Sequence, residues 1–296
     1  MIRKVLLALT GMVLAYDRNA AFALQLNHQA TAELQGVVDL HAHSDPDSVP
    51  RTIDAIDLAK LAASRGMRAL VLKNHYESTA SLAYLARKQV PGIELFGGIA
   101  LNRSVGGVNP AAVERMTLVK GGWGRVVWMP TFDAGVVPVS RDGKLLPSVD
   151  AVLDLIAKHQ LTLATGHSKP EEGLMLIRAA KAKGINRILV THGMLPPVSM
   201  TIDQMKEAAR LGAEVEFVYN ALTGPTKVFE PKQYADAIRA IGPENSVLSS
   251  DLGQPGNPLH PDGLSTFLKM LKAAGFTTSE LDLMSKTNPA ALLGLN

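Results

Sequence analysis

The sequence contains no cysteine. This absence excludes disulfide bonds, thiolate catalysis and every metal site built on thiolate ligands. A metal ion bound to this chain must therefore be held by histidine, aspartate, glutamate or a modified lysine.

Long runs of one charge are also absent. The sequence has no stretch of five or more lysines and arginines, and its formal net charge is only +3. Neither nucleic acid nor an anionic membrane is therefore indicated as a partner. The chain of 296 residues is 47% hydrophobic and 19% charged, which is enough to bury a full core in one large α/β domain or two smaller ones.

The N-terminus has the pattern of a secretory signal peptide. A basic start, Met1–Lys4, precedes an apolar run, Val5–Ala15, that is too short to span a bilayer comfortably. Ala21-Phe22-Ala23 has the small-x-small form that signal peptidase prefers. We expect cleavage near Ala23, which would leave residues 24–296 as an exported domain without a membrane segment, in the periplasm or outside the cell. The alternatives are an N-terminal helix packed on the domain and an uncleaved anchor.

Strand and helix patterns alternate from about Gly36 onward. Strands are expected at 37–43, 68–75, 94–102, 124–131, 161–167, 186–193, 214–219 and 246–251. Helices are expected at 53–65, 78–88, 110–120, 149–159, 170–183, 202–211, 232–241 and 263–274, and a last helical piece at 279–295 is expected to break near Asn288-Pro289. A turn is expected at Arg141–Lys144.

Eight strand–helix units in about 260 residues predict a single-domain α/β fold, the (β/α)₈ TIM barrel. The competing architecture, an open doubly wound sheet, would need a glycine-rich phosphate loop after its first strand. Neither G-x-G-x-x-G nor G-x-x-x-x-G-K-[ST] stands there. We find no linker that would divide the chain into two domains.

The first expected strand ends in His41-Ala42-His43. Residues i and i+2 of a strand share a face, so both imidazoles should point the same way, with Asp39 beneath them. Neutral imidazole is the commonest protein ligand for zinc and its neighbours. The alternative is an ordinary pair of polar residues at the end of a strand.

Four further ligand-type residues stand at the ends of other expected strands. His75 ends the second strand, His167 the fifth, His192 the sixth and Asp251 the eighth. A barrel carries its active site at the C-terminal ends of its strands. This sorting by strand terminus favours a metal centre over scattered core or surface histidines.

The order His-x-His on strand one, His on strands five and six, and Asp on strand eight resembles the amidohydrolase superfamily of metal-dependent hydrolases. The closing segment Thr287–Leu295 also resembles the C-terminal helix often found in that group. The resemblance implies the barrel, one or two divalent ions, and hydrolysis of an amide, ester, lactone or phosphoester bond. It also implies that one, more buried ion is bound by His41, His43 and Asp251, and a second ion by His167 and His192.

The chain departs from that superfamily at the residue that bridges two ions. Binuclear members use a carboxylated lysine or a glutamate, usually from strand four or three, and neither strand offers one here. Lys73 and His75 share a face of the second strand and could complete an unusual ligand set. Lys73 would be a carbamate bridge, a charged group that orients substrate, or the partner of an inward acid such as Asp39. The number of ions stays open.

His75 beside His-x-His is also similar to barrels of the polymerase-and-histidinol-phosphatase type. That group carries Asp-x-His on strand eight, whereas Asp251 is followed here by Leu252-Gly253.

The expected chemistry follows from a divalent cation, which lowers the pKa of bound water from about 16 towards 7 and polarises the scissile oxygen. Asp251 would accept the proton of that water and pass it to the leaving group. Zinc is the expected metal, as one or two ions, with manganese, iron and nickel as alternatives.

Residues just beyond the strand ends could contact a small-molecule substrate; they are Arg51, Arg103, Lys169 and His260. Ordinary surface charge is the alternative for the three cations. The leading function is a metal-dependent hydrolase. A metal-dependent lyase or decarboxylase, and an exported protein that binds metal without turnover, are the alternatives, and the mature protein could form a homo-oligomer.

Overall fold

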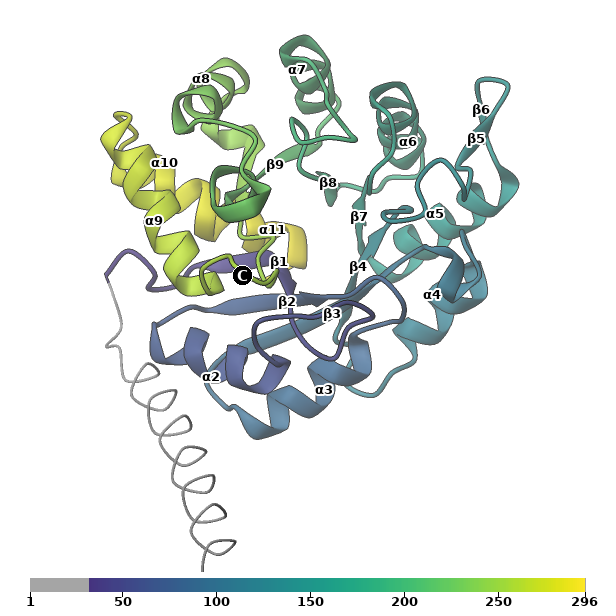
Figure 1. Cartoon of the computed structure of the whole chain (residues 1–296). Coiled ribbons are helices and arrows are strands. Elements are labelled where there is room, and N and C mark those ends of the chain that lie inside the picture. The colour runs from purple at the N-terminus through teal and green to yellow at the C-terminus, as the bar shows by residue number, and fades with distance from the viewer. Residues whose placement is uncertain (1–31, 296) are drawn as a thin grey trace, which may run out of the picture.

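The computed structural model describes residues 32–295, and its main element is a sheet of eight parallel strands. The strands pair in the order in which they occur along the chain (Figure 1). They are β1 (Val38–His43), β2 (Ala69–Lys73), β3 (Glu94–Ala100), β4 (Gly124–Trp128), β7 (Thr162–Ala164), β8 (Ile188–Val190), β9 (Glu214–Val218) and β10 (Ser246–Ser249). All eight lie within the expected ranges.

The first and last strands meet, so the sheet is a nearly closed barrel. The amide of Asp251, just after β10, donates to the carbonyl of His41 at 2.8 Å, and the amide of His43 donates to Leu252 at 3.0 Å. The carboxylate of Asp39 accepts from the amide of Ser250 at 2.9 Å. These bonds across the seam reject the open doubly wound sheet and confirm the predicted barrel.

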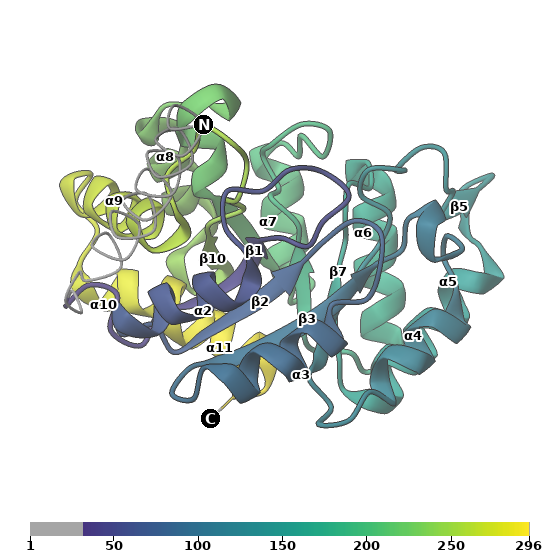
Figure 2. The same cartoon turned by 60° about the horizontal axis from the view of Figure 1, so that its bottom comes forward.

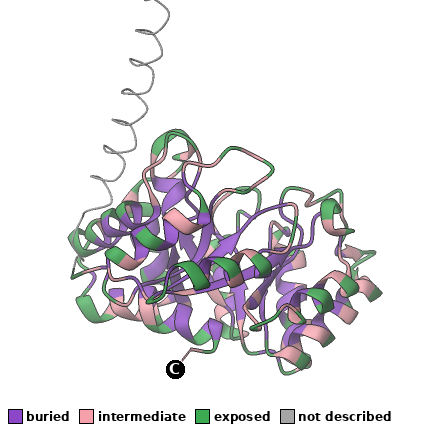
Figure 3. Cartoon of the chain, turned by 90° about the horizontal axis from the view of Figure 1, so that it is seen from below, coloured by how far each residue is buried: buried purple, intermediate pink, exposed green. Residues whose placement is uncertain are grey.

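Helices surround the strands in chain order (Figures 1 and 2). They are α2 (Ala55–Ser64), α3 (Ala80–Gln89), α4 (Pro110–Thr117), α5 (Pro147–His159), α6 (Pro170–Ala182), α7 (Ile202–Arg210), α8 (Pro231–Ile241), α9 (His260–Ala273), α10 (Thr278–Asp282) and α11 (Asn288–Leu293). Several begin at capping side chains, as expected where a loop enters a helix: Asp54 for α2, Asn109 for α4 and Thr201 for α7. Figure 3 shows buried strands inside helices whose outer faces are exposed.

The apolar core has two layers. The larger layer lies between the strands and the surrounding helices. The smaller layer fills the barrel and includes Trp128 and Phe96, together with Ala290, Leu292 and Leu293 of α11. The helix α11 is tied to the barrel by Asn288, whose side-chain amide donates to the carbonyl of Ser246 at 2.8 Å. The break expected near Asn288 is present, since a π-helical turn at Leu283–Thr287 precedes α11.

The expected turn at Arg141–Lys144 is the tip of a small hairpin, β5 (Ser140–Arg141) and β6 (Lys144–Leu145). Asp142 and Gly143 both have positive φ, of 50° and 71°, as a tight two-residue hairpin turn requires. The expected signal peptide lies outside the described residues. Within residues 32–295, no helix combines the length and apolar character needed to cross a bilayer.

Candidate metal centre

The strand β1 carries His41 and His43 into the top of the barrel, and both side chains are buried. The side chains of β1 do not alternate regularly between the two faces of the strand, although this alternation was expected. The reason is that the pairing of β1 with β2 shifts between Asp39 and Ala42. Asp39 therefore does not join the histidines. Its Oδ1 accepts from the amides of His41, at 3.1 Å, and of Ser250, and burial raises its pKa to about 6. The role of Asp39 is to tie β1 to β10.

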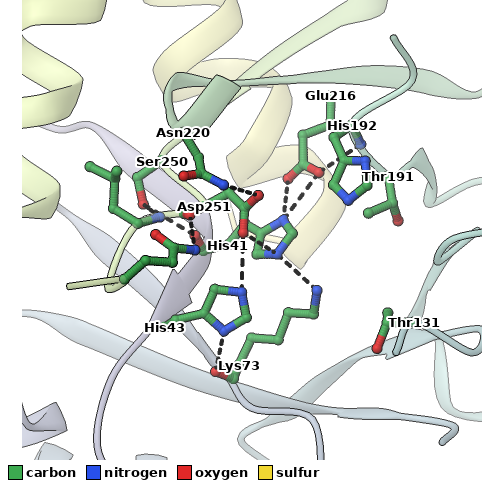
Figure 4. Close-up of polar contacts among 12 residues, drawn as sticks. His41, His43, Lys73, Thr131, Thr191, His192, Glu216, Asn220, Ser250 and Asp251 are labelled. Carbon is green, nitrogen blue, oxygen red and sulfur yellow. Dashed lines mark hydrogen bonds and ion pairs between the residues drawn. The ribbon is translucent and has the colours of Figure 1, made fainter. Parts of the chain in front are cut away.

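His41 and Asp251 present two acceptor atoms to each other. Nδ1 of His41 lies 3.2 Å from Oε2 of Glu216, a carboxylate that can only accept, so this nitrogen carries the hydrogen (Figure 4). In a neutral His41 ring Nε2 is then a lone pair, and it lies 3.1 Å from Oδ1 of Asp251. Two acceptors this close need a cation between or beside them, and Nζ of Lys73, 2.8 Å from Nε2 of His41, lies beside them here.

His43 points at the same oxygen. Its Nε2 lies 3.1 Å from Oδ1 of Asp251, and its Nδ1 lies 3.1 Å from the carbonyl oxygen of Lys73. A ligating histidine commonly donates its other ring N–H to such a carbonyl. Within residues 32–295, His41, His43 and Asp251 form the one group of three ligand-type side chains whose donor atoms all lie within 4.8 Å of one another. The donor set therefore fits a divalent ion.

Asp251 is held rigidly in this position. Its φ is 50°, in the left-handed region that few residues other than glycine, asparagine and aspartate adopt. Its Oδ2 accepts from Nδ2 of Asn220 at 3.2 Å. Burial alone would raise the pKa of Asp251, but its contacts with His41 and His43 and the nearby His192 hold that pKa well below its usual range. The carboxylate is ionised and can bind a cation or accept a proton.

His167 and His192 form a second pair next to the first. Their Nε2 atoms lie 3.1 Å apart, and the ring of His192 stacks 6.1 Å from that of His41. Burial lowers the pKa of His167 to about 2 and that of His192 to about 4. Both rings are therefore neutral at pH 7, and Nδ1 of His192 is buried without a hydrogen-bond partner. Two neutral imidazoles facing each other fit the second metal position implied by the superfamily.

Glu216 is a residue of the site that was not expected from the sequence. It lies in the middle of β9 with a fully buried side chain, and its carboxylate contacts His41 and accepts from the backbone amide of His192 at 3.0 Å. The pKa of Glu216 is lowered: burial opposes ionisation, and the contact with His41 favours it more strongly. The sequence does contain a pattern that indicates it, because Glu214-Val215-Glu216-Phe217 alternates acidic with apolar residues along a strand. An acid in that pattern lies inside the barrel.

Lys73 ends β2 and points into the site. Its Nζ lies 2.8 Å from Nε2 of His41, and burial lowers its pKa to about 8. The pairing with Asp39 considered above is not formed, because Asp39 binds the two amides instead. Lys73 therefore remains a candidate carbamate or a charged group beside the metal ligands.

The centre opens into a cavity of about 450 Å³. Its floor carries Lys73, His75 and the histidines described above. The other lining residues include six that are apolar, Val49, Pro50, Phe132, Leu195, Pro196 and Pro255, and three that are polar, Asn220, Thr226 and Gln254. The cavity is large enough for a small molecule with an apolar portion.

The four expected substrate contacts are dispersed. Arg51 lines the cavity, with Nη2 held by Asp47 at 2.6 Å and lying 3.2 Å from Nδ1 of His43. Lys169 lines a separate pocket of about 140 Å³ that shares His167 with the main cavity. Arg103 is exposed and does not line the cavity. His260 begins α9 and is fully buried, so the structure does not bring it to a substrate.

Comparison with known proteins gives a family and a fold. A sequence profile described as "Family of unknown function (DUF6282)" matches residues 36–216. No curated protein matches the chain. Among solved structures, organophosphorus hydrolase from Deinococcus radiodurans is 16% identical, with a TM-score of 0.62 over 89% of this chain and 94% of its own. A mutant of the PTE-like lactonase from Deinococcus radiodurans is 17% identical, with a TM-score of 0.61 over 90% of this chain and 98% of its own.

These likenesses confirm, at the level of the fold, the barrel expected from the resemblance to the amidohydrolase superfamily. A third structure, whose subject is organophosphate hydrolysis engineered from a weak promiscuous lactonase template, is 17% identical and has a TM-score of 0.62 over 89% of this chain and 97% of its own.

Proposed function

The chain belongs to the family of unknown function DUF6282, and we propose that it is a metal-dependent hydrolase of small molecules. One observation carries the proposal: Nε2 of His41 and Nε2 of His43 converge on Oδ1 of Asp251, each at 3.1 Å, and the three ligand atoms lie within 4.8 Å of one another. His41, His43 and Asp251 would hold one divalent ion, and His167 and His192 would contribute to a second. We expect zinc, because the ligands are imidazole and carboxylate.

A divalent ion held there would supply Lewis acidity, lowering the pKa of a nearby water and polarising the oxygen of the scissile bond. The protein's own residues would do the rest. Asp251 stays ionised and accepts a proton at its carboxylate, while Asn220 fixes its second oxygen. Glu216 holds the ring of His41 in the orientation that presents Nε2.

The apolar residues that line the cavity favour a substrate in which the reacting group is attached to an apolar portion. Such a substrate would place its carbonyl or phosphoryl group on the polar floor and its apolar portion against Phe132 and Leu195. The names of the structural relatives, a lactonase and an organophosphorus hydrolase, make lactones and phosphotriesters the first bonds to test. Esters and amides come next.

The test is metal analysis and turnover of the wild type beside Asp251→Asn. Asparagine tolerates the left-handed conformation at position 251, so the variant removes the charge and keeps the backbone. The panel contains δ-valerolactone, diethyl 4-nitrophenyl phosphate, 4-nitrophenyl acetate and an anilide. We expect one or two ions per chain in the wild type and a fall in kcat of at least about 100-fold in the variant. Asp236→Asn, an exposed aspartate of α8, is the matched control and should leave turnover unchanged.

A wild type that takes up no zinc or manganese would overturn the proposal. Metal uptake with no turnover on any of the four bonds would favour a lyase or a metal-binding protein over a hydrolase. A variant as active as the wild type would remove Asp251 from the chemistry.

We further propose that the protein is exported. The basic start, the apolar run and Ala21-Phe22-Ala23 support a cleaved signal peptide. Cell fractionation with N-terminal sequencing of the mature protein tests this, and a cytoplasmic protein that keeps Met1 would contradict it.

A further inference from the structure

A second polar network, outside the proposed metal ligands, links the segments that follow β2, β3 and β4. Its centre is Asn102, which follows β3 and is buried. Oδ1 of Asn102 accepts from the backbone amides of Thr131, at 2.9 Å, and Asp133, at 3.2 Å. Backbone amides can only donate, so they fix which end of the Asn102 amide is oxygen.

The other end of Asn102 must then donate. Its Nδ2 gives one hydrogen to the carbonyl of His75 at 3.0 Å and the other to Oγ1 of Thr131 at 2.9 Å. Oγ1 of Thr131 lies 2.9 Å from Nδ1 of His75. Oγ1 already accepts from Asn102, and within residues 32–295 His75 Nδ1 is the one acceptor in contact with the Thr131 hydroxyl, which favours donation from Thr131 to His75 Nδ1.

This arrangement favours one tautomer of His75. With Nδ1 accepting, the ring hydrogen is on Nε2, and this atom has no hydrogen-bond partner in the described part of the chain. His75 lines the cavity. Its ring lies between Phe132, at 3.5 Å between centroids with an interplanar angle of 12°, and His43, at 4.9 Å and 24°. These two stacking contacts orient the ring plane of His75.

We propose that His75 is a further catalytic residue, whose Nε2–H donates a hydrogen bond to the substrate oxygen that gains negative charge during hydrolysis. Asn102 and Thr131 are positioning residues that hold His75 in the donating tautomer. The proposal rests on the proposed hydrolase function. It assigns His75 a role other than metal binding, because a nitrogen that carries hydrogen cannot ligate, and His75 stands outside the cluster of His41, His43 and Asp251.

The tautomer can be tested without any substrate. In protein labelled with ¹⁵N at histidine, long-range proton–nitrogen correlation spectra of the zinc-loaded protein report which ring nitrogen of His75 carries hydrogen. We expect Nε2 to be protonated in the wild type and in Thr131→Ser, and the preference to be lost in Thr131→Val, which has the same shape without a hydroxyl. Hydrogen on Nδ1 in the wild type would overturn the proposal, and so would a ring shift that shows zinc on Nε2.

Kinetics test the catalytic role on whichever probe of the four-bond panel the wild type turns over. Removing one such donor typically costs about 100- to 1,000-fold in kcat. We expect a loss of that order in His75→Phe, a smaller loss in His75→Gln, whose amide can still donate, and little change in KM or bound zinc in either. We expect Thr131→Val to lower kcat about 10-fold, as an indirect effect on that donor, and Thr131→Ser to restore it.

The outcomes separate this inference from the proposed function. If the wild type binds zinc and turns over while His75→Phe is equally active, the donor role is wrong and the hydrolase stands. If His75→Phe loses zinc, His75 is a ligand and the proposal is overturned. If the wild type shows no hydrolysis, the hydrolase proposal fails and the catalytic role fails with it.

Discussion

Nζ of Lys73 lies 2.8 Å from Nε2 of His41, the same atom that faces the carboxylate of Asp251. An ammonium group in this position neutralises the two acceptors and competes with a metal ion for His41. Lys73 is buried, and burial lowers its pKa to about 8. The competition is therefore governed by pH near neutrality.

Zinc affinity should rise between pH 7 and pH 9. Below pH 8 Lys73 is a cation that repels zinc, and above pH 8 it is neutral. The pKa values of His43, His167 and His192 are already lowered, so these rings contribute little over this range. Lys73→Met should bind zinc about 10-fold more tightly at pH 7 and lose most of the pH dependence. Competition with a chromophoric chelator measures both, and weaker binding by the variant would instead indicate that Lys73 is a ligand, as a carbamate would be.

Glu216→Gln should weaken zinc binding about 10-fold while the fold is kept. The glutamine can still accept from Nδ1 of His41 but no longer carries the charge that favours this orientation. Zinc titration measures the affinity, and circular dichroism checks the fold. Glu230→Gln, an exposed glutamate at the start of α8, is a matched control that should bind zinc like the wild type. Unchanged affinity in Glu216→Gln would show that the contact with His41 is structural only.

The order of strands and helices was predictable because each unit repeats one physical pattern. Buried parallel strands are short apolar runs, and the helices between them end at glycine or begin at proline or a capping residue. Pro170, for example, opens α6 and Gly184 follows its end. The convergence of the histidines and Asp251 at strand ends was predictable for the same reason, since the barrel brings all C-terminal strand ends together.

The parts that were not predictable depend on contacts between distant segments. The shift in β1 that separates the carboxylate of Asp39 from the imidazole rings arises from pairing with β2 and β10, which no local pattern specifies. Burial of His260 likewise depends on how α9 packs under the seam. Its position after strand eight resembled that of a substrate contact, whereas its ring is fully enclosed.

Gly253→Ala should weaken zinc binding, because Gly253 packs against the backbone of His43. Gly253 has a φ of 123°, and a Cβ there would lie 2.3 Å from the carbonyl oxygen of His43. The backbone that carries His43 would have to move, so we expect a loss of zinc affinity of 10-fold or more together with roughly 2 kcal/mol of stability.

Gly143→Ala is the control that introduces backbone strain without a steric clash. Gly143 also has positive φ, of 71°, but a Cβ there would meet no atom within 4 Å. It should cost about 1 kcal/mol and leave zinc binding unchanged. Equal zinc affinities for the two variants would show that the seam tolerates movement at His43.

Glu214 should make the protein less stable as the pH rises from about 4.5 to 8. This residue begins β9, and its Oε2 is buried without a hydrogen-bond partner. Burial raises its pKa from 4.5 to about 8, so the folded chain keeps a proton that the unfolded chain releases in this range. The stability from this group is fully present below pH 4.5 and is lost as the pH rises through 8.

Glu214→Gln should therefore unfold with a smaller pH dependence and be more stable than the wild type at pH 9. We expect a difference of about 2 kcal/mol, since partial exposure of the side chain reduces the value that the full pKa shift would give. Urea denaturation at pH 4.5, 7 and 9 measures it, with the exposed Glu114→Gln as the matched control. If the wild type instead became more stable than Glu214→Gln as the pH rises, the carboxylate would be ionised in the folded protein and would have a cationic partner.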